Sequence, residues 1–125
     1  MQPLSIEHIN SLIESQLMSW HEAKRNFDRL MEIERKPLQL GDFHIAAQLN
    51  PARIRSTGAA VDKASVAARS CFLCKENRPA MQMSGEWPTP EWELLVNPYP
   101  ILPVHFTIAA KKHIPQERIP LEMAM

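Results

Sequence analysis

The sequence has no run of apolar residues as long as the roughly 20 that a membrane-spanning helix needs. It also has no basic N-terminal segment followed by an apolar core, so no secretory signal is visible in Met1 to Glu7. The first absence predicts a soluble protein without a membrane partner. The second predicts a location in the cytoplasm.

An excess of charge of one sign is also missing. Lys and Arg together number 14, and Asp and Glu together number 14, which gives a formal net charge of +0. Polyanions such as DNA are bound mainly through an excess of positive charge. We therefore expect no nucleic-acid partner, and any recognition of phosphate has to be local.

Glycine is scarce and proline is abundant, at three and 11 residues. Because proline interrupts helices and most of the prolines lie after residue 78, the second half is predicted to be extended and punctuated by turns. A chain of 125 residues fits one domain. We expect one partial domain over 1–125, with a helical region over 1–36.

The helical region is predicted from apolar residues that recur at intervals of three and four between Ser5 and about Met31. Ser5 is the expected N-cap. The repeat falters between Trp20 and Phe27, so the pattern is compatible with two helices or with one that has an exposed middle.

Short strands are predicted after the helical region, which makes the fold class α+β. Three segments have strand length and strand punctuation: Asp42–Leu49, Trp92–Val96 and His105–Ala110. The last two are joined by a proline-rich link over 97–104, which suggests an antiparallel meander. Between them and the first strand, Asp62 is expected to cap a short helix through Ala68.

The only two cysteines, Cys71 and Cys74, have the spacing Cys-x-x-Cys in a predicted turn. Two intervening residues let both thiolates approach one tetrahedral ion. A structural zinc has about four protein ligands, and there is no second cysteine pair, so histidines have to supply the rest. In a reducing compartment the pair is either such a metal half-site or a pair of free thiols, inert or redox-active.

Two segments resemble one superfamily. Leu94–Gln116 (LLVNPYPILPVHFTIAAKKHIPQ) resembles the part of histidine-triad (HIT-like) proteins in which a strand ends at a proline-bearing link and a second strand starts at a histidine. Cys71–Pro79 (CFLCKENRP) is similar to the Cys-x-x-Cys segment of galactose-1-phosphate uridylyltransferases, which belong to the same superfamily. The resemblance covers roughly 42–116 and implies an incomplete HIT-like antiparallel sheet with the helical region packed on it.

The resemblance also implies ligands for a metal ion. In the zinc-binding members, the cysteine pair is joined by the histidine that closes the second strand, which corresponds to Cys71, Cys74 and His113. The cofactor implied is therefore zinc. Its fourth ligand in the family is a histidine from a later segment.

A nucleotide or sugar-nucleotide is the small-molecule partner that the resemblance implies. Asn97 and His105 match positions beside the nucleoside, and Arg53 occupies a setting loosely similar to that of an arginine in the uridylyltransferases. Arg78 is a further candidate for a phosphate contact, because guanidinium groups bind phosphate bidentately. The alternative for Asn97 is a turn residue, for His105 a core histidine, and for the arginines a solvated surface.

The catalytic His-x-His-x-His motif of the family is absent, since no two of the five histidines are two residues apart. Its middle histidine is the nucleophile in the family. The resemblance therefore implies the N-terminal portion of a nucleotidyltransferase, phosphorylase or hydrolase acting on nucleoside or sugar phosphate esters, inactive alone and without a catalytic residue of its own. The alternative is a non-catalytic nucleotide-binding or interaction module of the same fold. Unpaired strand edges would let copies form a homo-oligomer.

Overall fold

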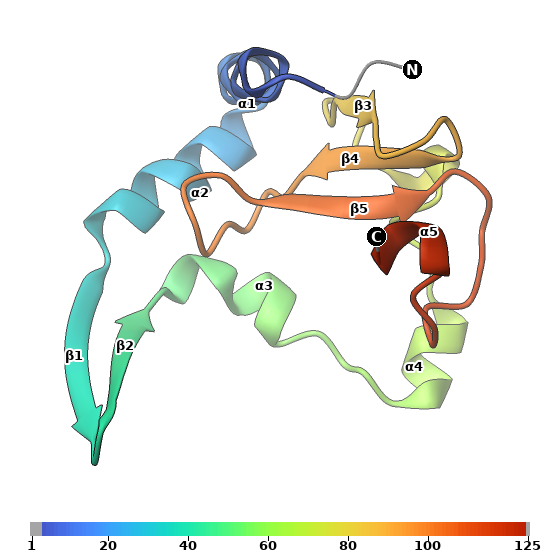
Figure 1. Ribbon diagram of the computed structural model, residues 1–125. Coiled ribbons are helices and arrows are strands. Elements are labelled where there is room, and N and C mark those ends of the chain that lie inside the picture. Colours follow the sequence, from blue (N-terminus) through green and yellow to red (C-terminus); the bar gives the residue numbers. More distant parts are fainter. Residues whose placement is uncertain (1–3, 125) are drawn as a thin grey trace.

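The computed structural model describes residues 4–124, without the side chains of Glu122 and Ala124. Its elements are α1 (Ile6–Ser19), α2 (His21–Glu32), β1 (Glu34–Leu40), β2 (Phe43–Leu49), η1 (Pro51–Arg53), α3 (Ile54–Thr57), α4 (Lys63–Ala68), η2 (Lys75–Asn77), β3 (Ser84–Glu86), β4 (Trp92–Val96), β5 (Phe106–Ala110) and α5 (Leu121–Ala124) (Figure 1). The strands form two small antiparallel sheets, in the orders β1-β2 and β3-β4-β5. This architecture confirms the predicted α+β class with an incomplete sheet. Within the described residues, no helix is both long and apolar enough to cross a membrane.

The predicted helical region consists of two helices that meet at Trp20. Ser5 caps α1, because its Oγ accepts a hydrogen bond from the His8 backbone N–H at 3.2 Å. Trp20 has an extended backbone and an indole that is only 6% exposed, so the break between the helices buries the largest side chain of this region. The second helix ends at Glu32 rather than near residue 36, because the chain from Glu34 onward pairs with β2.

The core lies around β4, whose five residues are all buried. The predicted meander is confirmed: β4 pairs with β5 in antiparallel register, with Leu95 opposite Thr107. On its other side β4 pairs with β3, a strand that the sequence analysis did not predict. The buried apolar residues lie just before α2, in α2, and in the three-stranded sheet: Trp20, Ala23, Leu30, Trp92, Leu94, Leu95, Val96 and Ala109.

Gln16 joins the first helix to the segment that precedes β3. Its side chain is fully buried, at 0% exposed, although glutamine is usually a surface residue. Nε2 donates to the Met81 carbonyl at 2.7 Å, and Oε1 accepts from the Met83 backbone N–H at 2.5 Å. Both ends of the amide are therefore satisfied, as burial of a polar group requires.

Replacing Gln16 with alanine is expected to lower the free energy of unfolding by about 1–3 kcal/mol, because the Met83 N–H and the Met81 carbonyl lose their partners. Urea unfolding followed by circular dichroism measures this loss. Glu14→Ala is the control, since Glu14 is exposed on the same helix and its loss is expected to cost less than about 0.5 kcal/mol. Equal effects of the two substitutions would contradict the role given to Gln16.

The strands β1 and β2 form a two-stranded arm (residues 34–49) that projects from the rest of the protein (Figure 1). The strand predicted at 42–49 is confirmed as β2, whereas β1 was not predicted. All seven residues of each strand are exposed. Gly41 lies in the turn with φ 59°, a left-handed conformation that glycine adopts at little cost. The arm therefore hardly touches the core.

Candidate functional site

Cys71, Cys74 and His113 come together in space. The Cys74 Sγ lies 3.2 Å from the His113 Nδ1, and the three potential ligand atoms all lie within 4.8 Å of one another. Ideal tetrahedral zinc separates a thiolate sulfur from an imidazole nitrogen by about 3.5 Å, and two sulfurs by about 3.8 Å. The donor types and their separations therefore fit a metal ion. The three residues form a group that could hold one, as the resemblance implied.

The loop that carries the two cysteines is fixed by its own backbone. The Cys74 N–H donates to the Cys71 carbonyl at 3.2 Å, and the Asn77 N–H donates to the Cys74 carbonyl at 2.9 Å. The Asn77 side-chain amide also donates to the Cys71 carbonyl, at 3.0 Å. These bonds form the predicted turn and fix the two cysteines relative to each other. His113, which follows β5, lies beside Cys74.

The two thiols differ in their tendency to ionise. Burial raises the pKa of the Cys71 thiol, but hydrogen bonds from the backbone N–H groups of Leu73 and Cys74 outweigh burial, so its pKa lies below the ordinary value. Burial, followed by the neighbouring Cys71, raises the pKa of the Cys74 thiol. Cys71 therefore ionises more readily than Cys74, and a thiolate is the form that binds metal.

Arg78 and Glu93 form a buried ion pair that holds the cysteine loop against the sheet. Arg78 Nη1 lies 2.6 Å from Glu93 Oε2, and the two side chains are only 7% and 12% exposed. Arg78 Nε also donates to the Leu73 carbonyl at 2.8 Å, between the two cysteines. Arg78 is thus engaged by the protein itself, so the alternative of a solvated surface arginine is wrong for it, and the phosphate contact stays a prediction.

This ion pair was missed by the sequence analysis, although one signal was present. Glu93 is the single charged residue in the apolar strand Trp92–Val96, and a buried carboxylate needs a partner. Burial raises the pKa of Glu93, but the hydrogen bond and the positive charge of Arg78 outweigh burial, so its pKa lies below the ordinary value. The carboxylate is therefore ionised at neutral pH.

Asn97, His105 and Arg53 all contact the proline-rich link between β4 and β5. Asn97 Oδ1 accepts from the Tyr99 N–H at 2.8 Å, and Arg53 Nε donates to the Tyr99 carbonyl at 2.9 Å. His105 Nδ1 accepts from the Ile101 N–H at 3.2 Å. The structure thus brings together the three residues expected at a nucleotide, and each already uses a polar atom to hold the link.

His105 is neutral near pH 7, because burial and then the positive charge of Arg53 lower its pKa. Since Nδ1 accepts a hydrogen bond, the ring proton is assigned to Nε2, which leaves one donor on the imidazole. His105 and Asn97 line a cavity of only about 10 Å³, which is enough for about one water molecule. The described residues therefore do not form a nucleoside pocket here.

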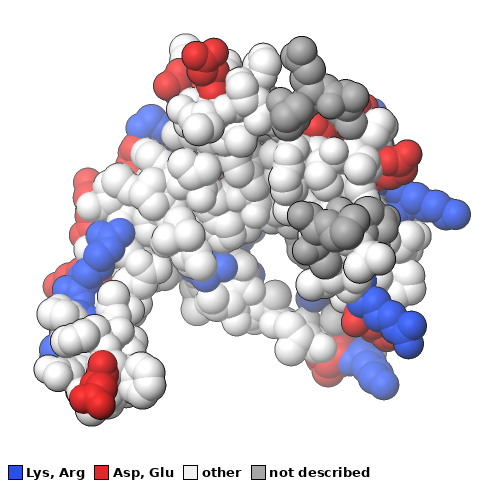
Figure 2. All heavy atoms as spheres, in the orientation of Figure 1, with Lys and Arg blue, Asp and Glu red and all other residues white. Residues whose placement is uncertain are grey.

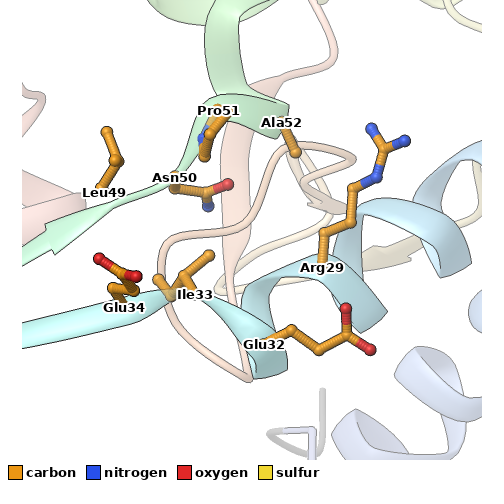
Figure 3. A pocket seen from close by; sticks show the side chains of 8 residues that line it. All are labelled: Arg29, Glu32, Ile33, Glu34, Leu49, Asn50, Pro51 and Ala52. Atoms are coloured by element: carbon orange, nitrogen blue, oxygen red, sulfur yellow. The ribbon is translucent and has the colours of Figure 1, made fainter.

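A much larger cavity lies where the arm joins the body of the protein (Figure 3). Its volume is about 390 Å³, within the range of small-molecule sites. It is lined by Arg29, Glu32, Ile33, Glu34, Leu49, Asn50, Pro51 and Ala52. None of these residues was a site residue in the sequence analysis, since the cavity depends on how α2, the arm and η1 meet.

One family model, described as a domain of unknown function (DUF4922), matches residues 12–123. The chain belongs to the DUF4922 family. The match runs from α1 to α5, so the DUF4922 domain includes the metal-ligand group, the buried ion pair and the arm. No curated protein and no solved structure matches the chain.

Proposed function

We propose that this chain is the N-terminal portion of a HIT-like nucleotidyltransferase, phosphorylase or hydrolase that acts on nucleoside or sugar phosphate esters. In this proposal Cys71, Cys74 and His113 hold a structural zinc ion. The observation that carries it is the convergence of these three side chains, whose ligand atoms lie within 4.8 Å of one another although Cys74 and His113 are 39 residues apart.

The proposed role of zinc is to tie two segments together. The cysteines lie in the loop before β3, and His113 lies just after β5, so the whole sheet β3-β4-β5 separates the ligands in sequence. When bound, zinc would cross-link these segments by tetrahedral coordination. The resemblance assigns the fourth ligand to a histidine of a later segment, and a water molecule can take that position in this chain.

The proposed nucleotide site is the link between β4 and β5. Its donors are the Nε2 of His105 and the guanidinium of Arg53, beside Asn97 at the end of β4. Because the cavity here is so small, a nucleoside needs further residues to enclose it. In the family that enclosing segment carries the catalytic histidines.

The cytoplasm is the location that we propose for the protein. Free thiols such as Cys71 and Cys74 fit this reducing compartment.

Cobalt titration tests the metal site, because a cobalt ion bound by thiolates absorbs by charge transfer. We expect one Co²⁺ per chain, displaced by Zn²⁺. Cys71→Ser, Cys74→Ser and His113→Ala are each expected to weaken binding by more than about 100-fold, since even the loss of an outer hydrogen-bond partner costs about 10–100-fold. His8→Ala is the matched control, because His8 is exposed on α1 outside the group.

Two results would contradict the metal site: cobalt binding that survives His113→Ala unchanged, or no binding by the reduced protein. The catalytic part of the proposal has its own test, because the chain lacks the triad nucleophile. We expect no nucleotidyl transfer from a sugar nucleotide by the purified chain. Measured nucleotidyl transfer by the purified chain alone would contradict this part of the proposal.

The alternative is a non-catalytic nucleotide-binding or interaction module. The observation that favours it is that Asn97, His105 and Arg53 already hold the link through their own hydrogen bonds. Calorimetric titration with a nucleoside diphosphate separates the two proposals. Binding by the chain alone, lost in Arg53→Ala, supports the module, whereas a portion of an enzyme is expected to bind only with its enclosing segment present.

A further inference from the structure

The two cysteines are the first and fourth residues of a turn that the backbone closes. The Cys74 N–H donates to the Cys71 carbonyl at 3.2 Å, which is the hydrogen bond of a β-turn. Such a turn keeps its first and fourth Cα atoms within about 7 Å of each other. A disulfide usually spans about 4.4–6.8 Å between Cα atoms, so the backbone of this loop already suits a bond between Cys71 and Cys74.

The two sulfur atoms are close as well. Cys71 Sγ and Cys74 Sγ belong to the three ligand atoms that lie within 4.8 Å of one another, and both residues are free thiols. A disulfide bond is about 2.05 Å long, so the sulfurs have to approach each other by less than about 3 Å. Rotation of a cysteine side chain between staggered rotamers supplies a movement of this size. The loop can therefore form the bond without a change in its backbone.

Contacts behind the loop hold this geometry without the help of a metal ion. The Asn77 side-chain amide donates to the Cys71 carbonyl at 3.0 Å, and Arg78 Nε donates to the Leu73 carbonyl at 2.8 Å. Neither Asn77 nor Arg78 belongs to the metal-ligand group. We therefore expect the two thiols to stay adjacent in the metal-free protein.

A small oxidant can reach the pair. Both cysteines are partly exposed, and Phe72 between them is 64% exposed. On the side of the molecule where α4 and the segment after β5 lie in Figure 1, Figure 2 shows side chains of both charges. Since neither sign prevails on this side, charge does not keep away an anionic oxidant such as glutathione disulfide.

We propose that Cys71 and Cys74 form a redox-sensitive pair, in which oxidation by a small-molecule disulfide closes a Cys71–Cys74 bond and releases the proposed zinc ion. The inference rests on the proposed function, because it describes the regulation of that same site. The two states exclude each other, since sulfurs that share a zinc ion lie about 3.8 Å apart and bonded sulfurs about 2.05 Å. A disulfide sulfur also lacks the negative charge of the thiolate that binds metal. Only His113 then remains of the ligand group.

The oxidation consists of two thiol–disulfide exchange steps. In the first, one cysteine thiolate attacks glutathione disulfide, a bond forms between their sulfurs, and one glutathione leaves as a thiolate that takes up a proton. In the second, the other cysteine thiolate attacks the cysteine sulfur of this mixed disulfide, and the second glutathione leaves in the same way. The cysteine pair loses two electrons and two protons, and glutathione disulfide becomes two glutathione thiols. Because the second step joins groups that the turn already holds together, it is expected to be faster than the first.

Oxidation would undo the cross-link that zinc is proposed to make. The cysteine loop and the segment after β5 meet where Cys74 Sγ lies 3.2 Å from His113 Nδ1, and a Cys71–Cys74 disulfide leaves no thiolate on the loop side of that contact. In a reducing compartment such a disulfide is usually transient. The reduced, zinc-bound form is then the resting state, and the oxidised form appears only when the concentration of the small-molecule disulfide rises.

The pair is tested first in the zinc-free chain, by incubation with glutathione disulfide. We expect mass spectrometry after alkylation of the remaining thiols to find a disulfide between Cys71 and Cys74 of one chain. Cys71→Ser and Cys74→Ser are each expected to stop at the mixed disulfide with glutathione, because the second thiol is missing. A parent chain whose cysteines stay reduced, or carry only glutathione, would overturn the proposal.

Zinc is expected to protect the pair from oxidation. At a free zinc concentration about 100 times Kd, only about 1% of the chains are metal-free, so oxidation should slow by about 100-fold. His113→Ala is expected to bind zinc more than about 100-fold more weakly, so at the same zinc concentration its oxidation should slow by at most about twofold. His8→Ala, outside the ligand group, should behave as the parent chain does. Equal rates of oxidation of the parent chain with and without zinc would contradict the regulation.

The oxidised chain is expected to bind Co²⁺ more than about 100-fold more weakly than the reduced chain, and reduction by a phosphine is expected to restore binding. Cobalt binding that is equal in the two forms would overturn the inference and leave the zinc site standing. Failure of the zinc site itself appears earlier, as a reduced chain that binds no metal before any oxidant is added, and it would overturn both proposals.

Discussion

Replacing Arg78 with alanine is expected to lower the free energy of unfolding by about 3–5 kcal/mol. The substitution leaves the Glu93 carboxylate buried without its counter-charge, and it leaves the Leu73 carbonyl without the Arg78 donor. Removing one partner of a buried pair costs far more than the pair itself contributes, because the remaining charge is desolvated and uncompensated. Urea unfolding at pH 7 measures the loss.

Two comparisons decide whether burial is the cause. Lys24→Ala breaks the pair between Lys24 and Asp28, whose side chains are 48% and 53% exposed, and should cost only about 0.3–0.5 kcal/mol. Arg78→Met combined with Glu93→Met should cost less than Arg78→Ala alone, since no buried charge remains. If the loss in the free energy of unfolding of the double variant equals the sum of the losses in the two single variants, the two residues act independently and the interpretation is wrong.

The pH dependence follows from the lowered pKa of Glu93. The unfolded carboxyl has an ordinary pKa of about 4.3, and the folded one titrates below it. A group with a lowered folded pKa contributes stability that is fully present above the unfolded pKa and is lost as pH falls through the folded pKa. We expect stability to decline below about pH 4.3, and this part of the decline to be absent in Glu93→Gln.

Elements with a strong local signal were predictable from the sequence. The helices have an apolar period and the cap Ser5, α4 has the cap Asp62, and β4 and β5 are short apolar runs bounded by turns. The strands β1 and β3 lack such a signal. The first contains Pro37 and three charged residues, and the second is only Ser-Gly-Glu, so both exist through pairing with a neighbour.

The candidate site could be predicted only in part from the sequence, for a similar reason. The cysteine pair is local, but the sequence offers five histidines, and the resemblance rather than spacing selected His113. Its position depends on the meander, which returns the chain to the cysteine loop after β5. Contacts between distant segments also form the ion pair of Arg78 with Glu93 and the cavity at the base of the arm. Such contacts become visible only when separate segments are placed in space.

Removing the proposed zinc ion is expected to destabilise the protein by an amount set by the affinity of the site for zinc. Zinc that binds only the folded chain adds RT ln(1 + [Zn]/Kd), about 4 kcal/mol at a free concentration 1,000 times Kd. For a domain of 125 residues this corresponds to a fall in Tm of roughly 15 °C when a chelator is added. The reason is geometric: the group of Cys71, Cys74 and His113 forms only with the folded sheet, since β3, β4 and β5 lie between Cys74 and His113.

His113→Ala separates this effect from any action of the chelator on the protein. The variant keeps the cysteine pair, which can bind zinc in the folded and unfolded chains alike and therefore adds little stability. We expect its Tm to be low and nearly the same with and without chelator in a thermal scan, whereas His8→Ala should respond as the parent chain does. An equal response of His113→Ala and the parent chain would mean that the cysteines alone carry the metal and that His113 does not close the site.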